Sequence, residues 1–222
     1  MSVEDDFRIR IESSSINKNT LHCKAYLEYI GENKTLLEYI EGLRQHYEPI
    51  IAYVNIRFDS DTMTYRGAGY DINYTRRGTK KIKLPFFMYN GFLNQFYNYA
   101  SGYDLYKKFP VLQKTKGISY VLLMCCICEA LKLGFITPES ILMLEASGSI
   151  EGESMLKLIK YYEKIGFSVM YPEYLDIGVQ DQFVPMKAQV KTIVDLCNVE
   201  TVSPDMMKLL PVQMCKGICR SN

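Results

Sequence analysis

The sequence predicts a single mixed α/β domain, and three observations support this fold class. Segments that alternate apolar and polar residues, typical of half-buried strands, occur near the start of the chain. In the second half, helical patterns over 119–133 and 153–165 alternate with strand patterns. Apolar residues make up 48% of the 222 residues, enough for a sizeable core, and no Pro/Gly-rich linker divides the chain. We expect one domain over 1–197 and a peripheral C-terminal tail over 198–222.

Two strands and a helix are expected first. Residues 7–16 alternate apolar and charged side chains and predict a strand. The polar run 17–19 predicts a turn, and 21–30 predicts a second strand. Residues 35–47 carry four apolar residues on one side of a helix, so we expect a helix there.

A hairpin and an aromatic segment follow. The runs 50–58 and 62–75 have strand composition, and Asp59-Ser60-Asp61 between them predicts the turn of a hairpin. The segment 84–109 is rich in aromatic residues and is compatible with one or two strands or with a short helix around 92–99. We expect its part 84–101 to be an insertion, which in a silent binding module would cover the acceptor cleft or form an interface.

The next elements are clearer. Residues 119–133 are almost entirely apolar and predict a buried helix, with Ser119 as its N-cap and Gly134 just past its end. Residues 141–147 predict a strand between a proline and a glycine.

The last elements begin with an amphipathic helix over 153–165, which Gly166 ends. Strands are expected over 167–170 and 184–196, and a short helix over 205–210. The second half therefore runs loop, helix, strand, helix, strand, strand.

Charge and composition exclude several classes of protein. Lys and Arg number 26 against 25 Asp and Glu, and this balance argues against a dedicated nucleic-acid binder. The longest apolar run, 120–128, is less than half the length of a membrane-spanning helix. The acidic N-terminus has no secretory pattern, so we expect an intracellular, cytoplasmic protein whose seven cysteines are reduced. Two histidines leave little room for a multi-histidine metal site, and we expect no metal.

A candidate anion site lies at 112–119, where basic residues and a glycine lead into the apolar helix. The N-terminus of a helix has unsatisfied N–H groups and the positive end of the helix dipole. Gly117 permits close approach of the backbone to a phosphate, and Lys114 and Lys116 add positive charge. The alternative is a solvated basic turn that only begins the helix.

A second candidate is Tyr162, on the apolar side of the helix 153–165. Taken alone, this position is typical of a core tyrosine whose hydroxyl is satisfied at the edge of the core.

Together the two segments resemble the GNAT superfamily of acyl-CoA-dependent N-acyltransferases, best over 105–195. The family's loop pattern, Gln/Arg-x-x-Gly-x-Gly/Ala, falls on Lys114, Gly117 and Ser119, with Lys and Ser as departures. The family's next helix typically ends in Leu-Tyr-Glu-Lys-x-Gly-Phe, which 161–167 match with a tyrosine in the leucine position.

The resemblance implies a largely antiparallel twisted sheet with helices on both faces and a splayed pair of parallel strands. These strands, the family's fourth and fifth, would lie at about 103–109 and 141–147 and admit the pantetheine arm of acetyl-CoA. Tyr162 would give a proton to the departing thiolate. The loop backbone would bind the pyrophosphate, which makes these the expected cofactor-binding residues: Lys114, Thr115, Lys116, Gly117, Ile118, Ser119 and Tyr120.

The general base is not determined by the resemblance. Glu145 is one candidate because its strand neighbours are apolar, although a carboxylate at the sheet margin explains it equally well. Asp104 is another candidate, and ordered water is a third.

We therefore expect an acetyl-CoA-dependent N-acetyltransferase that acts on a primary amine, in a small molecule or a protein. The alternative is a catalytically silent GNAT-like domain that serves as a binding or scaffold module. An unrelated α/β interaction domain is a third interpretation. The sequence does not determine the oligomeric state, and a dimer is compatible with it.

Overall fold

Seven strands and eight helical segments make up the described part of the chain. The computed structural model describes residues 3–42, 49–65, 87–98, 103–147, 152–170, 184–197 and 202–209. The strands are β1 (Phe7–Ser15), β2 (Thr20–Tyr29), β3 (Ile50–Tyr65), β4 (Phe87–Asn98), β5 (Ile141–Ala146), β6 (Ser168–Val169) and β7 (Val184–Gln189). The helices are α1 (Val3–Asp6), α2 (Lys34–Gly42), α3 (Tyr103–Lys108), the 3-10 helix η1 (Pro110–Thr115), α4 (Ile118–Lys132), α5 (Gly152–Lys164), α7 (Val190–Asp195) and α8 (Pro204–Lys208).

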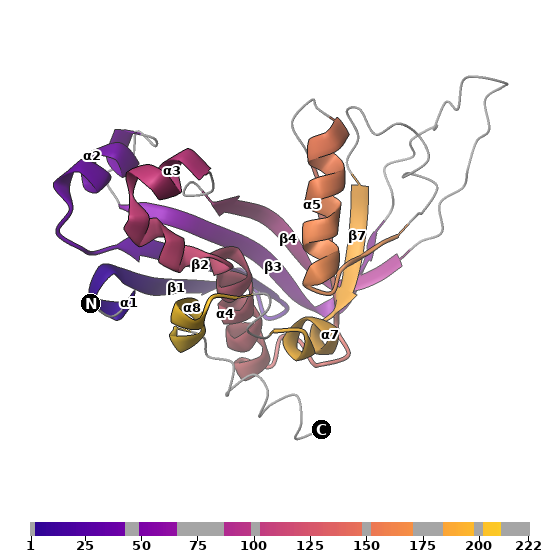
Figure 1. The fold of residues 1–222 in the computed structure, drawn as a ribbon. Helices are drawn as coiled ribbons and strands as arrows, with labels where there is room; N and C mark the ends of the chain where they lie inside the picture. Colours follow the sequence, from indigo (N-terminus) through magenta and orange to yellow (C-terminus); the bar gives the residue numbers. More distant parts are fainter. Residues whose placement is uncertain are drawn as a thin grey trace, which may run out of the picture.

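The strands form one sheet in the order β1-β2-β3-β4-β5-β7-β6 (Figure 1). β4 and β5 are parallel, and every other neighbouring pair is antiparallel. α2 and α3 lie together near one end of the sheet, and α5 contacts β5 and β6. The expected mixed α/β class, with a largely antiparallel sheet and one parallel pair, is confirmed.

The N-terminal hairpin agrees with its sequence pattern. β1 pairs with β2 from Phe7↔Tyr29 to Ser15↔Leu21, and the Asn17 side chain accepts a hydrogen bond from the Asn19 N–H in the turn. Alternate residues of β2 are buried on one face, where α4 packs. The hydrophobic face of the hairpin therefore becomes part of the main core.

β3 continues through the expected turn, so the hairpin predicted at 59–61 is wrong. Asp59 accepts hydrogen bonds from the Thr20 hydroxyl (2.6 Å) and the Arg57 guanidinium (2.9 Å). The polar run marks a shift in the β3–β4 register between Phe58 and Met63 rather than a reversal. The expected strand beyond residue 65 lies outside the described residues.

β4 lies in the aromatic segment, and the fourth strand expected at 103–109 is wrong because α3 occupies that region. The expected insertion at 84–101 thus contributes a strand in the middle of the sheet. Its aromatic residues pair across strands, as Tyr53 and Tyr97 do with ring centroids 5.1 Å apart.

α4 is the central helix of the core. All of its residues except Glu129 and Lys132 are buried, as expected for a helix that is apolar on every side. Its N-cap is Gly117, with φ of 82°, and Ser119 is the second helical residue instead of the expected cap. A glycine fits there because other residues pay a steric penalty in the left-handed region.

α4 and α5 end in the same way, with a glycine in the left-handed region followed by phenylalanine. At the end of α5, the N–H of Phe167 donates to the Tyr162 carbonyl (3.0 Å) and the N–H of Gly166 to the Glu163 carbonyl (3.1 Å). This is the Schellman pattern, and Gly134 with Phe135 repeats it at the end of α4. The predicted ends of both helices are confirmed.

The C-terminal elements differ from expectation in two ways. β7 ends at Gln189 and the chain turns into α7, so the strand expected to reach 196 is wrong in its second half. The described part of the tail is also not peripheral, because Val202 and Met206 are buried in the core. α8 contacts both η1 and α4.

Substitution of the two cap glycines should have unequal effects. Gly134→Ala should lower the free energy of unfolding by about 1–2 kcal/mol, the cost of a left-handed alanine, because nothing lies near the added Cβ. Gly166→Ala should cost about 1 kcal/mol more, since its Cβ would lie 3.2 Å from Thr192 Cγ2. Urea unfolding measures both values, and equal losses would contradict the crowding argument.

Candidate functional site

The parallel strands β4 and β5 pair over only three residues and then separate. Gly91, Phe92 and Leu93 face Leu142, Met143 and Leu144, and no pairing of these strands follows in the described register. A Cβ on Gly91 would lie 2.5 Å from a Leu142 methyl, so glycine permits the close approach where pairing begins. Pairing ends beside Asn94, which is the extra residue of a bulge in the β3–β4 register. A bulge bends its strand and is common beside active sites.

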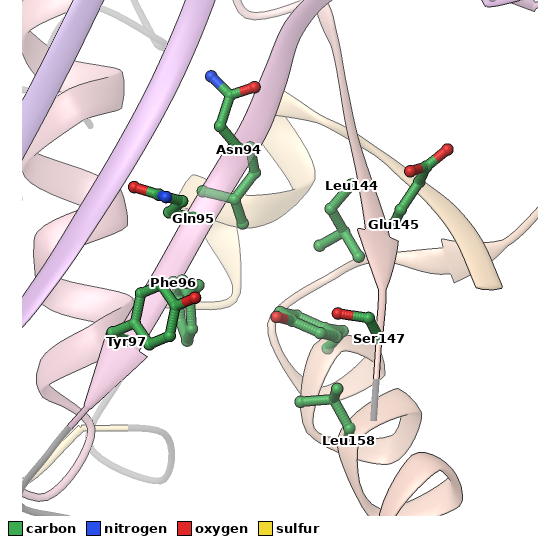
Figure 2. Close-up of a pocket in the computed structure, with 10 residues that line it drawn as sticks. Asn94, Gln95, Phe96, Tyr97, Leu144, Glu145, Ser147 and Leu158 are labelled. Carbon is green, nitrogen blue, oxygen red and sulfur yellow. The ribbon is translucent and has the colours of Figure 1, made fainter. Parts of the chain in front are cut away.

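A cavity of about 320 Å³ opens where the strands separate (Figure 2). Its walls come from residues 93–97 of β4, from Leu144, Glu145 and Ser147, and from Leu158 and Tyr162 of α5. Residues 93–97 include side chains from both faces of β4, because neighbouring strand residues point to opposite sides. The cavity is therefore lined from both faces of the sheet.

Tyr162 forms part of the cavity wall and is 7% exposed. Its ring makes edge contacts with Phe96 (centroids 5.7 Å apart) and Phe167 (6.0 Å), and its carbonyl belongs to the cap of α5. Its hydroxyl has no hydrogen-bond partner among the described residues and is not a fully buried atom, so it borders the cavity. Burial raises the pKa of Tyr162 to about 12, so the phenol keeps its proton at neutral pH.

Tyr161 connects the end of α5 with the beginning of α4. Its phenol lies beside the Ser119 side chain, which acts to lower the phenol's pKa, and its ring lies 5.9 Å from that of Phe96. Burial and the neighbouring Tyr162 raise the pKa of the Tyr161 phenol. The two segments singled out in the sequence are thus in direct contact.

The loop before α4 presents three backbone donors. In the part of the chain that the structure describes, the N–H groups of Gly117, Ile118 and Ser119 have no acceptor. The Tyr120 N–H already donates to the Gly117 carbonyl (3.0 Å), so it is not free to bind the pyrophosphate as expected. Three adjacent N–H groups at the positive end of a helix suit an anion.

The side chains of the loop contribute less than expected. The Lys114 ammonium lies 2.8 Å from the Asp6 carboxylate, in a separate hollow of about 440 Å³ beside Tyr29. Thr115 is fully buried and donates to the Leu112 carbonyl (2.7 Å). Lys116 is exposed, and it is the cationic side chain nearest along the chain to the three N–H groups.

Ile118 and the Tyr120 ring belong to the core, and the Tyr120 hydroxyl donates to the Ile193 carbonyl. The resemblance to the family's loop pattern did not show that these two side chains are buried, because the pattern gives only the spacing of residues along the chain.

Glu145 also borders the cavity, whose lining includes the apolar side chains of Leu144 and Leu158. Its side chain is exposed and extends from the side of β5 opposite to Leu144 (Figure 2). Asp104 belongs to α3, and its side chain is outside what the structure describes.

The sequence reasoning missed the β4 contribution to the cavity, in particular Gln95, Phe96 and Tyr97. The aromatic residues of this segment, which are enriched in strands, were the available signal. They follow no two-residue alternation, so the pattern did not separate a strand from a short helix.

The cysteines have no catalytic surroundings. Cys23, Cys125, Cys126 and Cys197 are buried thiols outside any disulfide, whereas Cys128 is disulfide-bonded, contrary to the expectation of reduced thiols throughout. Burial raises the pKa of Cys125 to about 12, which leaves it protonated and unreactive at neutral pH.

Among the described residues, no cluster of three or more His, Cys, Asp or Glu side chains is arranged to hold a metal ion. None of the described helices has the length and apolar character that crossing a bilayer requires.

No protein-family model matches the chain, and it is similar to no curated protein and no solved structure. Function is therefore inferred from the geometry of the cavity and the loop, and from the chemistry of their groups.

Removal of single hydroxyl groups should distinguish the two buried tyrosines. Tyr120→Phe should lower the free energy of unfolding by about 1–3 kcal/mol, because it leaves the buried Ile193 carbonyl without its donor. Tyr162→Phe should change it by less than about 0.5 kcal/mol, since its hydroxyl has no described partner. Urea unfolding tests both, and a large loss for Tyr162→Phe would show that its hydroxyl is structural.

The raised pKa of Tyr162 also predicts a pH dependence. A phenol that ionises near pH 10 when unfolded and near pH 12 when folded stabilises the protein below pH 10 and loses that contribution as pH rises to 12. The decline amounts to roughly 3 kcal/mol for this group. Tyr162→Phe should make the fall in unfolding free energy between pH 10 and 12 smaller, and an unchanged fall would contradict the assignment.

Proposed function

We propose that the protein is an acetyl-CoA-dependent N-acetyltransferase that acetylates a primary amine. The observation that carries this proposal is the separation of β4 from β5, with the Tyr162 hydroxyl on the wall of the resulting cavity. The three unbonded N–H groups at the start of α4 support it, since they suit the cofactor's pyrophosphate. A splayed parallel pair beside such a loop is what the resemblance to the GNAT superfamily implies.

The residues suit acetyl-CoA in two respects. The N–H groups of Gly117, Ile118 and Ser119 would bind the pyrophosphate, with Lys116 as the adjacent exposed cation. The separated edges of β4 and β5 would border the pantetheine arm, because their backbone groups no longer pair with each other there.

The bound cofactor supplies an acetyl thioester. The uncharged amine attacks the carbonyl carbon, a C–N bond forms, the C–S bond breaks, and the thiolate leaves. A backbone N–H of β4 polarises the carbonyl oxygen, which is an oxyanion-hole type of stabilisation. The amine's proton passes to Glu145, which borders the cavity and is exposed, or to ordered water.

Tyr162 stabilises the departing thiolate mainly as a hydrogen-bond donor. Its pKa of about 12 exceeds that of an ordinary thiol, about 8.5, so complete proton transfer would be uphill by roughly 5 kcal/mol. A hydrogen bond to the charged sulfur needs no such transfer and strengthens as charge develops.

A catalytically silent GNAT-like domain that serves as a binding or scaffold module is the second candidate. One observation favours it: the Lys114 charge, expected to help bind the phosphates, is paired with Asp6. Only the first candidate requires turnover.

Binding and turnover are tested together. Acetyl-CoA at about one hundred times its Kd should stabilise the protein by about 2.7 kcal/mol, a rise in Tm of roughly 5–10 °C. Tyr162→Phe should lower kcat about 100-fold with a panel of primary amines while leaving the Kd for acetyl-CoA unchanged. Calorimetry and release of free thiol measure these quantities.

Tyr39→Phe is the matched control, since Tyr39 lies in α2 against Phe109, away from the cavity lining. Its kcat should equal that of the wild type. Absence of any acetyl-CoA binding would overturn the proposal, and binding without thiol release for any amine would favour the silent module.

A further inference from the structure

Ser203 holds the candidate phosphate-binding loop from a distant part of the chain. It immediately precedes α8 and donates hydrogen bonds to two carbonyl groups of the loop. One of them, the carbonyl of Lys114, lies 89 residues earlier in the sequence. We propose that Ser203 is a positioning residue that orients the Gly117 N–H toward the diphosphate of the acyl donor. This inference rests on the proposed function and deepens it, because it assigns the loop's specificity to a diphosphate-bearing donor.

Two hydrogen bonds join Ser203 to the loop. Its hydroxyl donates to the Lys114 carbonyl (2.9 Å), and its N–H donates to the Lys116 carbonyl (3.1 Å). The same hydroxyl oxygen accepts from the Met206 N–H (3.2 Å) and caps α8. The hydroxyl is thus used as a donor toward the loop and as an acceptor toward its own helix.

The bond from Ser203 to the Lys116 carbonyl determines the direction in which the Gly117 N–H points. In a trans peptide the C=O and N–H point in opposite directions, and the described chain contains no cis bond. The Lys116 carbonyl points at Ser203, so the N–H of Gly117 in the same peptide group points away from Ser203. That N–H is one of the three donors without an acceptor in the described residues.

Other interactions hold the rest of the loop, so Ser203 acts mainly on the peptide group between Lys116 and Gly117. Lys114 is tied to Asp6 through its side chain, and the Thr115 hydroxyl donates to the Leu112 carbonyl. The Gly117 carbonyl accepts from the N–H groups of Tyr120 and Val121, so the peptide group after Gly117 is fixed by α4. The peptide group before Gly117 is bonded through its Lys116 carbonyl to Ser203. Ser203 supplies the constraint at this point, because Val202 and Met206 fix its position in the core.

A preorganised set of N–H groups favours a donor that carries a diphosphate over one that lacks it. Acetyl-CoA carries the diphosphate, and acetyl-pantetheine carries the same thioester arm without it. The two donors therefore separate an effect on the loop from an effect on the cavity.

Ser203→Ala removes the hydroxyl bond to Lys114, and Ser203→Pro removes both bonds while fitting the observed φ of −61°. We expect acetyl-CoA to bind about fivefold more weakly to the first variant and still more weakly to the second. Affinity for acetyl-pantetheine and kcat at saturating acetyl-CoA should not change. Ser203→Thr, which keeps the hydroxyl, should restore wild-type affinity.

Calorimetry gives the affinities, and the amide resonance of Gly117 reports directly on its orientation and on binding of inorganic pyrophosphate. Ser168→Ala is the matched control, because Ser168 also donates to a backbone carbonyl, that of Lys187 on β7, without contacting the loop. If Ser203→Ala folds poorly, Ser203→Gly replaces it, since glycine caps a helix nearly as well as serine.

Three results would overturn the inference. Equal weakening of both donors would assign Ser203 a merely structural role. Unchanged affinity in Ser203→Pro, with the wild type binding acetyl-CoA, would refute the inference and leave the proposed function intact. A wild type that binds neither acetyl-CoA nor pyrophosphate would refute both.

Discussion

The end of pairing between β4 and β5 at Leu93 is the constraint on which the candidate site depends. Inside a sheet, strands normally satisfy each other's backbone groups, and unpaired groups are costly when buried. Here the pairing begins at Gly91, where the missing Cβ lets Leu142 approach, and ends at the bulge residue Asn94. Glycine and bulge together give a short, well-defined contact followed by an opening with polar edges.

The side chains around this opening are positioned by two different kinds of interaction. Tyr162 is held locally, by the cap that Gly166 and Phe167 form at the end of α5. The loop before α4 is held by distant groups, Asp6 on one side and Ser203 on the other. Tyr161, which precedes Tyr162, lies beside the Ser119 side chain at the start of α4 and connects the two parts.

Local patterns predicted much of the fold. Helix ends were accurate where a glycine must adopt a positive φ, as at Gly134 and Gly166, because that requirement depends only on nearby residues. The mixed sheet with its parallel pair was also predicted at the level of class. The residues 59–61 were wrongly predicted to form a turn, because turn-forming residues also occur where the register shifts inside a long strand. There the Asp59 carboxylate accepts hydrogen bonds from Thr20 and Arg57.

Non-local contacts explain what the sequence did not reveal. Nothing near Lys114 indicates that its charge is satisfied by a carboxylate 108 residues earlier, so its expected contribution to phosphate binding was too large. The β4 segment was compatible with a strand or a short helix, because its aromatic residues follow no regular two-residue alternation. The role of Ser203 had no local signal, since a serine before Pro204 predicts only a helix cap.

The long-range anchoring of the loop has a consequence for how the protein acquires its site during synthesis. Contacts between residues far apart in sequence form late, because closing a long loop costs entropy before the contact is gained. The cap around Tyr162 needs only six consecutive residues and can form as soon as α5 does. The loop waits for Ser203, so a nascent chain shorter than about 200 residues has its tyrosine in place but no ordered anion site.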